Sequence, residues 1–325
     1  MKCPSCQRTH KRRDGLTCAC GAAFVFDPKD KYNFTDTRFA KVLRRVSAGY
    51  TRSFTKGQLR TAFVLEYQQR ALGSLGGAVL FAVFMAGIIG VLGVGVFHTW
   101  WGFALGPVLT PPMLVAHRRS ARRVIPSRHE VESWITRWTQ NRGPIKGLLR
   151  EPSLSAPTPY RDAKDLFDYG VAHLLVVDSD LLVDFLVLNG WAAQHHCLVV
   201  SHTGYPTHAV PLAHRFLGEQ PDLPVWLYHG PTRHAFEVEL REAGWPLDGH
   251  PVRDLGLFAA QLSETRFIAR HFPGLDLRTF TADMLPPPVL LGALGACLAA
   301  GATFGPLLAA NRASNKAGDS DSDFG

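Results

Sequence analysis

The run from Ala71 to Ala116 contains no Asp, Glu, Lys or Arg, and this feature restricts the folds open to the chain more than any other. One bilayer crossing needs roughly 20 apolar residues, so the run has room for two. Tryptophan favours the membrane–water boundary, and Trp100 and Trp101 stand at the natural turn, while basic residues flank both ends. The run therefore predicts a transmembrane hairpin over about Leu75–Phe97 and Trp101–Ala116. A buried pair of apolar helices is the alternative.

Charge is distributed unevenly along the chain. Residues 1–70 hold 15 Lys+Arg and 5 Asp+Glu, and residues 117–150 hold 9 and 2. Residues 151–284 reverse the balance, with 9 and 17. Because the basic segments flank the predicted hairpin, anionic membrane lipid is the expected partner, at about 1 kcal/mol per basic residue near the surface. Nucleic acid is the alternative partner, and only through the basic N-terminal region.

Four of the six cysteines fall within the first 20 residues, as Cys3-Pro4-Ser5-Cys6 and Cys18-Ala19-Cys20-Gly21. In a reducing compartment such clustering favours a metal over disulfides. Two cysteine pairs joined by a short hairpin can place four thiolates tetrahedrally, which suits Zn²⁺. We therefore predict that Cys3, Cys6, Cys18 and Cys20 bind a structural zinc ion. His10 is a less favoured substitute ligand.

These motifs resemble the zinc-ribbon family over about residues 2–27. The resemblance depends on the CPxC knuckle, on the glycine that follows the second knuckle, and on Phe24 and Phe26. The chain departs from the family pattern because one residue, where two are usual, separates Cys18 from Cys20. Zinc ribbons bind nucleic acid or protein, or only cap a domain, and the sequence does not choose among these roles.

Basic amphipathic helices are expected within residues 28–70. Phe39, Val42, Leu43 and Val46 recur at the spacing of one helix face. Thr55-Lys56-Gly57-Gln58 has the form of a capping box and predicts the start of a second helix. Residues 117–160 predict a basic juxtamembrane helix that ends near Asn141–Pro144, followed by a linker. The helices in 28–70 either bind a membrane surface or a partner, or only pack on the ribbon.

Residues 161–284 alternate apolar runs with helical patterns, which favours a parallel sheet covered on both faces. The predicted strands are His173–Val177, Cys197–Val200 and Pro224–Tyr228, and the predicted helices are Asp180–Leu188, Thr207–Leu217, His234–Ala243 and Phe258–His271. Ligands of such sheets bind beyond the carboxyl ends of the strands. There the chain offers Asp178, His202 and His229, which could bind a transition metal or perform acid–base catalysis. The alternative is that the histidines stand at strand ends by chance, because this region is rich in histidine.

The same region resembles a Toprim domain, as found in the A subunit of type IIB topoisomerases. The resemblance covers roughly Leu174–Ala243 and depends on the strand that ends in Val177-Asp178, on the Gly204-Tyr205-Pro206 turn and on the strand Leu223–Leu227. In that family a glutamate after the first strand and an Asp-x-Asp after the third hold Mg²⁺ for cleavage and rejoining of DNA. Here Asp178 replaces the glutamate, and Tyr228-His229-Gly230 replaces the two aspartates. Since Mg²⁺ requires oxygen ligands, the resemblance implies the fold without the activity.

The C-terminal part contains a second uncharged run, Val289–Ala310, which follows Pro286-Pro287-Pro288. Its length predicts a third crossing within residues 285–311. The remaining residues, 312–325, are polar and are expected to be disordered. Three crossings from a cytoplasmic N-terminus would place this tail outside the cell.

Together these patterns predict a multi-domain protein of the cell (inner) membrane. Its parts would be a zinc ribbon (1–27), basic helices (28–70), a transmembrane hairpin (71–116), a juxtamembrane helix and linker (117–160), a cytoplasmic Toprim-like α/β domain (161–284) and a C-terminal crossing (285–311). The expected function is a non-enzymatic sensor, scaffold or regulatory module that binds a protein partner or forms a homo-oligomer. The alternative is a membrane-tethered, metal-dependent hydrolase or nuclease that uses Asp178, His202 and His229.

Overall fold

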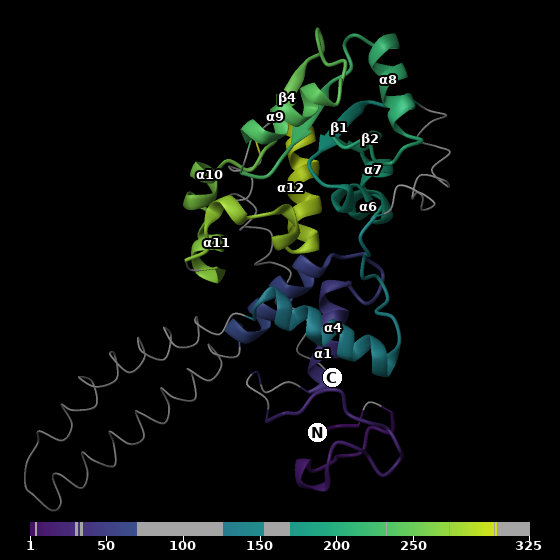
Figure 1. Cartoon of the computed structure of the whole chain (residues 1–325), viewed down its shortest axis with the longest axis vertical. Coiled ribbons are helices and arrows are strands. Elements are labelled where there is room, and N and C mark those ends of the chain that lie inside the picture. The colour runs from purple at the N-terminus through teal and green to yellow at the C-terminus, as the bar shows by residue number, and fades with distance from the viewer. Residues whose placement is uncertain are drawn as a thin grey trace, which may run out of the picture. The chain divides into compact units, whose positions relative to one another are not determined.

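The computed structural model describes residues 1–3, 5–29, 32, 35–69, 126–152, 170–231, 233–272, 274–301 and 303. The chain divides into two compact units, of which the first contains Met1–Thr61 with Val131–Gly325 and the second contains Ala62–Glu130. Figure 1 labels the helices and strands that are named below.

The N-terminal segment of the first unit consists of two short hairpins, each closed by an isolated antiparallel bridge. Lys2 pairs with Thr9, and Thr17 pairs with Ala23. The 3-10 helix η1 (Arg12–Asp14) connects the hairpins and ends at Gly15, whose φ of 94° suits glycine. Regular structure is short here, so the fold of this segment depends on its small core and on the cysteines described below.

Helices α1 (Asp36–Val46) and α4 (Arg128–Arg142) pack together in the first unit; the amphipathic pattern predicted α1, and the basic segment after residue 117 predicted a helix at α4. Helix α1 begins at Thr35, whose side chain accepts a hydrogen bond from the backbone N–H of Arg38. Its predicted apolar face, Phe39, Val42, Leu43 and Val46, is buried. Helix α4 ends where the sequence predicted, and from Val131 onward it belongs to the same unit. The Trp138 ring stacks on Phe39 of α1 with a centroid distance of 4.7 Å.

A further helix covers residues 56–69 and starts with the predicted capping box. The backbone N–H of Thr55 donates to Oε1 of Gln58 at 3.0 Å, and the backbone N–H of Gln58 donates to Oγ1 of Thr55 at 3.1 Å. Two orphan donors at the helix start are thereby satisfied reciprocally.

The α/β domain contains a four-stranded, fully parallel sheet with the order β2-β1-β3-β4. The strands are β1 (His173–Val177), β2 (Cys197–Ser201), β3 (Val225–Tyr228) and β4 (Val252–Asp254). The first three coincide closely with the predicted strands. The sequence analysis missed β4, which is three residues long and largely exposed.

Helices connect the strands and cover the sheet (Figure 1). They are α6 (Asp180–Leu188), α7 (Trp191–Gln194), α8 (Val210–Glu219) and α9 (Arg233–Glu242). The predicted helix Phe258–His271 is divided into α10 (Ala259–Glu264) and α11 (Arg266–His271), which meet at the extended residue Thr265. Two 3-10 turns follow, η3 (Leu277–Thr279) and η4 (Ala282–Met284).

The C-terminal helix α12 (Pro287–Ala300) corrects the prediction of a third membrane crossing. It stops at Gly301, well short of the predicted Ala310, and it packs inside the first unit. Leu290, Leu294 and Cys297 are completely buried, and the indole N–H of Trp191 donates to the carbonyl of Leu291 at 3.1 Å. The helix is apolar throughout, and one face of it is buried in the protein while Gly292 and Ala299 are exposed. An apolar helix that packs against protein cannot be distinguished from a membrane span by composition.

The fold class expected from the sequence, a membrane protein, is therefore wrong for the part of the chain that the structure describes. None of its helices combines the length and the apolar character that a crossing requires. What is present is an α/β domain with a parallel sheet, joined to N-terminal hairpins and helices.

The second unit is described at residues 62–69 and 126–130. Ser127 and Glu130 form a reciprocal cap at the start of α4, with hydrogen bonds of 2.8 and 3.2 Å. The predicted hairpin, residues 71–116, lies outside the described residues, as does most of the predicted linker.

Candidate functional site

The four N-terminal cysteines come together in one cluster. Each knuckle is a tight turn: the backbone N–H of Gln7 donates to the carbonyl of Cys3, and that of Gly21 donates to the carbonyl of Cys18. The sulfur atoms of Cys3 and Cys20 lie 3.6 Å apart, and those of Cys6 and Cys18 lie 3.7 Å apart. All four sulfurs lie within 4.8 Å of one another, so they could hold a metal ion.

The surroundings of the cluster favour thiolates at some positions. The backbone N–H of Cys6 lowers the pKa of the Cys3 thiol to about 6. For Cys6, the backbone N–H of Arg8 lowers the pKa, but burial and the neighbouring thiols outweigh it and raise the pKa to about 11. Because thiolate is the form that ligates metals, binding is expected to displace the remaining protons.

A small core supports the cluster. Cys3, Cys18 and Phe24 form its buried centre, with partly buried side chains of Met1, Cys6, Leu16 and Ala22 around them. His10, the substitute ligand considered from the sequence, lies outside the set of four. One ring nitrogen of His10 lies 3.0 Å from the carbonyl of Gly15, and its ring packs against Phe24.

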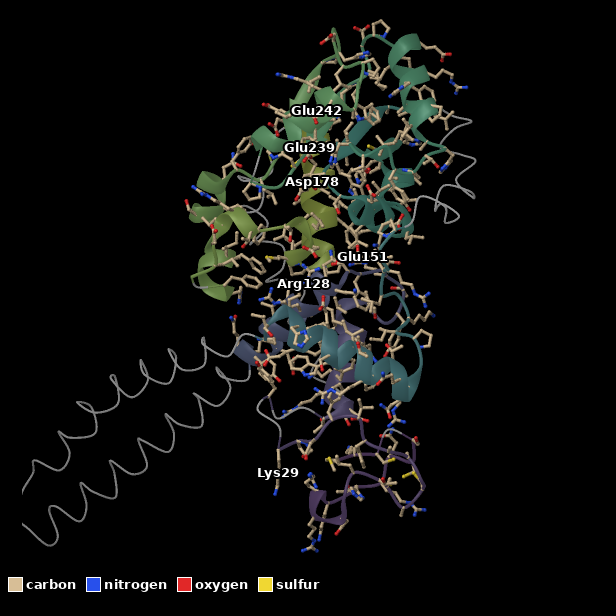
Figure 2. All side chains as sticks on the ribbon, viewed as in Figure 1. Lys29, Arg128, Glu151, Asp178, Glu239 and Glu242 are labelled. Carbon is tan, nitrogen blue, oxygen red and sulfur yellow. The ribbon has the colours of Figure 1, made fainter. Side chains whose placement is uncertain are left out.

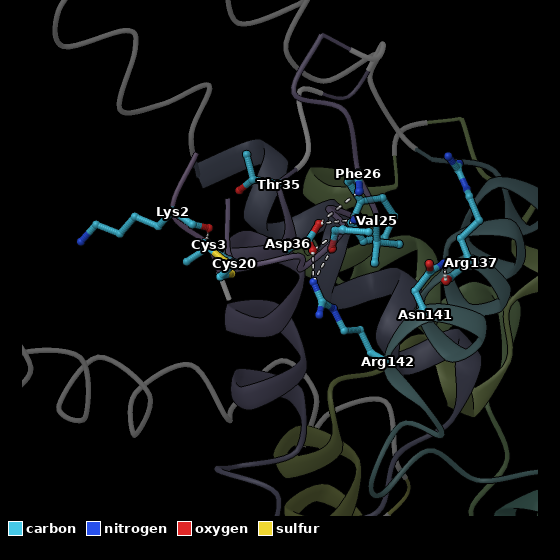
Figure 3. Close-up of polar contacts among 12 residues, drawn as sticks. Lys2, Cys3, Cys20, Val25, Phe26, Thr35, Asp36, Arg137, Asn141 and Arg142 are labelled. Atoms are coloured by element: carbon cyan, nitrogen blue, oxygen red, sulfur yellow. Dashed lines mark hydrogen bonds and ion pairs between the residues drawn. The ribbon is translucent and has the colours of Figure 1, made fainter. Parts of the chain in front are cut away.

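Asp36 connects the cysteine hairpins to the helices, and sequence reasoning missed this role. Its carboxylate accepts hydrogen bonds from the backbone N–H groups of Val25, at 3.0 Å, and Phe26, at 3.1 Å. The guanidinium of Arg142 donates to the same carboxylate at 3.1 Å (Figure 3). An acidic residue in the first turn of a helix is ordinary, so the sequence carried no signal for these contacts.

The three residues predicted at the sheet edge do lie beyond the carboxyl ends of their strands. Asp178 follows β1, His202 follows β2 and His229 follows β3. β1 lies between β2 and β3, so the connections leaving β1 and β3 diverge at this point, which is where open α/β sheets usually bind ligands. The fold therefore brings the three residues to one edge.

Each of them already has a partner within the protein. The backbone N–H of Gly230 donates to Oδ2 of Asp178 at 2.6 Å, which bridges the ends of β1 and β3. Nε2 of His202 lies 3.0 Å from the carboxylate of Glu239, and Nε2 of His229 lies 3.1 Å from that of Asp254. Figure 2 labels Asp178 and Glu239 in this part of the molecule.

His229 is the most enclosed of the three, with its side chain 2% exposed. Nδ1 of its ring faces the carbonyl of Gly230. The ring also lies directly over Gly256, where a Cβ would stand 2.0 Å from Nε2. Glycine at position 256 is therefore required for the ring to reach Asp254.

The pKa shifts follow from this burial. Burial raises the pKa of Asp178, while the Gly230 N–H and the nearby histidines partly oppose the change. Burial lowers the pKa of His229, but the Asp254 carboxylate and the Gly230 carbonyl outweigh it, so that the net pKa is raised. The ring of His229 thus lies between two oxygen atoms, the Gly230 carbonyl and the Asp254 carboxylate.

Both ring nitrogens of His229 face oxygen atoms of the protein, so neither nitrogen is directed at a metal position. Within the described ranges, the four cysteines form the one set of three or more such side chains whose ligand atoms lie close enough together to hold an ion. Asp178, His202 and His229 do not form such a set, although they share an edge.

The sequence did not predict the two carboxylates that face His202 and His229 at this edge. Asp254 ends the strand that was not predicted, and Glu239 lies on the helix that was predicted but without a role. Cys197, the first residue of β2, is completely buried.

The chain was compared with protein-family models, with curated proteins and with solved structures, and none of the three comparisons gave a significant match.

Proposed function

We propose that this chain is a non-enzymatic binding or regulatory protein that combines a zinc ribbon with a Toprim-like α/β domain. The observation that supports this proposal most directly is the pairing at the sheet edge. There Asp178, His202 and His229 pair with Gly230, Glu239 and Asp254, and both ring nitrogens of His229 face oxygen atoms of the protein. A catalytic carboxylate or imidazole needs a free position for substrate or metal.

Zinc is the metal that the cysteine cluster fits best. Sulfur ligands at about 2.3 Å from a tetrahedral zinc ion lie about 3.8 Å from one another. The observed separations of 3.6 and 3.7 Å match this value. Four ligands leave no open position, so the ion would stabilise the hairpins and would not activate water.

The Toprim resemblance is supported as far as the parallel sheet and its edge. Asp178 follows the first strand, and the turn at Gly204 has the left-handed φ of 88° that glycine permits. At the position of the family's two aspartates the chain has Tyr228, His229 and Gly230. His229 is used in the pair with Asp254, which argues against Mg²⁺ at this place.

The partner is proposed to be anionic and to bind the basic N-terminal part. Lys41, Arg44 and Arg45 are exposed on α1, opposite its buried face. We propose nucleic acid as this partner, because its phosphates are closely spaced negative charges, and each phosphate neutralised contributes about −0.9 to the slope of log K against log salt for duplex DNA.

The first test uses the full chain. We expect about one zinc ion per chain, no heat of binding for Mg²⁺ or Mn²⁺ in calorimetry, and no phosphodiesterase or phosphatase turnover. Divalent-metal-dependent turnover that Asp178→Ala abolishes without unfolding the sheet would overturn the proposal in favour of a hydrolase.

The second test addresses the partner. Fluorescence anisotropy with a labelled oligonucleotide compares the wild type with the double variant Lys41→Glu/Arg44→Glu. The matched control is Arg215→Glu/Arg241→Glu, which makes the same charge change on exposed positions of α8 and α9. We expect weaker binding and a smaller salt slope only for the α1 variant. Binding to vesicles of anionic lipid without binding to the oligonucleotide would contradict the nucleic-acid assignment.

A further inference from the structure

The carboxylate of Asp36 stands at the junction between the cysteine hairpins and the helices. Its side chain is 0% exposed, and all its named donors come from other segments. Val25 and Phe26 supply backbone N–H groups from the end of the second hairpin, and Arg142 supplies its guanidinium from the end of α4 (Figure 3). Asp36 itself is the first residue of α1.

The two backbone donors belong to the same hairpin as two of the cysteines. Within it, the backbone N–H of Cys18 donates to the carbonyl of Ala22 at 2.8 Å, and that of Phe24 donates to the carbonyl of Leu16 at 2.7 Å. The chain then runs directly into Val25 and Phe26. The direction of these two N–H groups is therefore fixed by the second knuckle.

Arg142 holds the hairpin a second time. Its guanidinium donates to the carbonyl of Ala23 at 2.6 Å, in addition to the carboxylate of Asp36. One side chain of α4 thus contacts both the hairpin and the first turn of α1. The rings of Phe26 and Phe39 close the same junction, with a centroid distance of 4.9 Å.

A buried carboxylate that loses its donors is strongly destabilised. If the second knuckle loosens, Asp36 loses the two backbone N–H groups and retains only Arg142. The helices can relieve the strain only by exposing the carboxylate to water, which separates α1 from α4. Order in the knuckle and packing of the helices are therefore linked.

We infer that Asp36 and Arg142 are positioning residues that couple metal binding at the cysteine cluster to the packing of α1 against α4. The inference rests on the proposed function in so far as the cysteines hold a metal. It adds that metal occupancy controls how firmly the basic helix α1 is held. Because coupling between two sites is reciprocal, breaking the junction must weaken metal binding by the same factor.

The test measures both sides of this linkage in the full chain. Co²⁺ absorption bands, titrated against a chelator, give the metal affinity. Hydrogen exchange followed by mass spectrometry gives the protection of α1 and α4, with β1 and β2 as an internal reference. Upon metal removal we expect exchange in α1 to accelerate by about tenfold or more, within the usual range of coupling factors, while the strands stay unchanged.

Two variants break the junction in different ways. Asp36→Asn keeps the shape of the side chain and removes its charge, and Arg142→Gln removes the contacts from α4. Each is expected to weaken Co²⁺ binding by about tenfold and to make exchange in α1 nearly independent of metal. Unchanged exchange in β1 and β2 shows that the variants are folded.

Asp27→Asn is the matched control, because Asp27 pairs with Arg12 and accepts from the N–H of Lys29, which both belong to the segment before α1. In this variant α1 should still respond to metal as in the wild type. If the wild type shows normal Co²⁺ bands but exchange in α1 does not change upon metal removal, the coupling is overturned and the metal site is not. Absence of the bands in the wild type would instead overturn the proposed metal site.

Discussion

The cysteine cluster and the sheet edge both contain side chains that commonly bind metals, but these side chains face one another in the cluster and face other groups at the edge. In the cluster, four sulfurs face one another within 4.8 Å. At the edge, His202 and His229 each face a separate carboxylate, and Asp178 faces a backbone N–H. The cluster could hold an added ion, whereas the three side chains at the edge each face a group of the protein itself.

The difference shows that the role of a site depends less on its residue types than on the partner of each residue. A carboxylate and two histidines at one edge suggest a metal centre from the sequence. The same three residues, once paired, lock the ends of neighbouring strands to each other and to α9. We expect changes in the cluster to alter metal binding and changes at the edge to alter stability.

The largest effect is expected for Cys18→Ser, which removes a soft ligand from the buried side of the cluster. Altering a residue that only supports a ligand costs roughly 10- to 100-fold in metal affinity, so loss of a ligand itself should cost more than about 100-fold. Competition of Co²⁺ with a chelator measures this. Cys297→Ser, in α12, is the control and should leave metal content unchanged. A full complement of metal in the Cys18 variant would remove the distinction between the two regions.

The next largest effect is expected for Asp254→Asn. His229 is almost fully buried, and the variant removes the charge of the carboxylate that lies 3.1 Å from its Nε2, an interaction of about 1.5–3 kcal/mol for a charged partner. Urea unfolding of the α/β domain should show a loss of free energy of unfolding of that size. Asp248→Asn, an exposed acid on the loop before β4, should change it by less than about 0.5 kcal/mol. If Asp254→Asn leaves the free energy of unfolding unchanged, the pair does not stabilise the edge.

The pH dependence of stability provides a further distinction. The raised pKa of His229 means that its contribution is fully present below the ordinary value of 6.5 and is lost as pH rises through the raised value. The raised pKa of Asp178 acts in the same direction, beginning from its ordinary value of 3.8. The urea midpoint should therefore fall as pH increases above 6.5, and His229→Gln should flatten this part of the profile. A profile that is identical in the variant would contradict the charged pairing.

The smallest effect is expected for Glu239→Gln. The Glu239 side chain is 51% exposed, and exposed ion pairs contribute only about 0–1 kcal/mol. The free energy of unfolding should fall by less in Glu239→Gln than in Asp254→Asn. Added salt should reduce the difference between Glu239→Gln and the wild type further. A loss as large as that of Asp254→Asn would show that the two histidine pairs are equivalent, which their burial argues against.

Much of the local structure could be read from the sequence. The face of α1 with Phe39 and Val42, the capping box at Thr55 and the first three strands follow from side-chain periodicity and hydrogen-bonding chemistry. The four cysteines could be read as one site because their spacing along a short hairpin leaves few other arrangements. These features depend on contacts between residues near one another in the chain.

Other features depended on contacts over long distances in the sequence. The strand β4 is short and exposed, so it has no apolar pattern, and its pairing with β3 alone makes it a strand. Asp254, Glu239 and Arg142 gained their roles in the same way, from partners on other elements. Sequence patterns contain no record of such partners.

The apolar run at the C-terminus illustrates the same limit. Its composition determined that Val289–Ala300 would form a helix shielded from water, because so many apolar side chains cannot remain exposed. Only the tertiary structure decided that residues of the protein such as Trp191 and His195 cover part of this helix. Lipid and the protein interior both remove apolar side chains from water, so composition alone cannot distinguish them. The residues that pack against the helix do distinguish them.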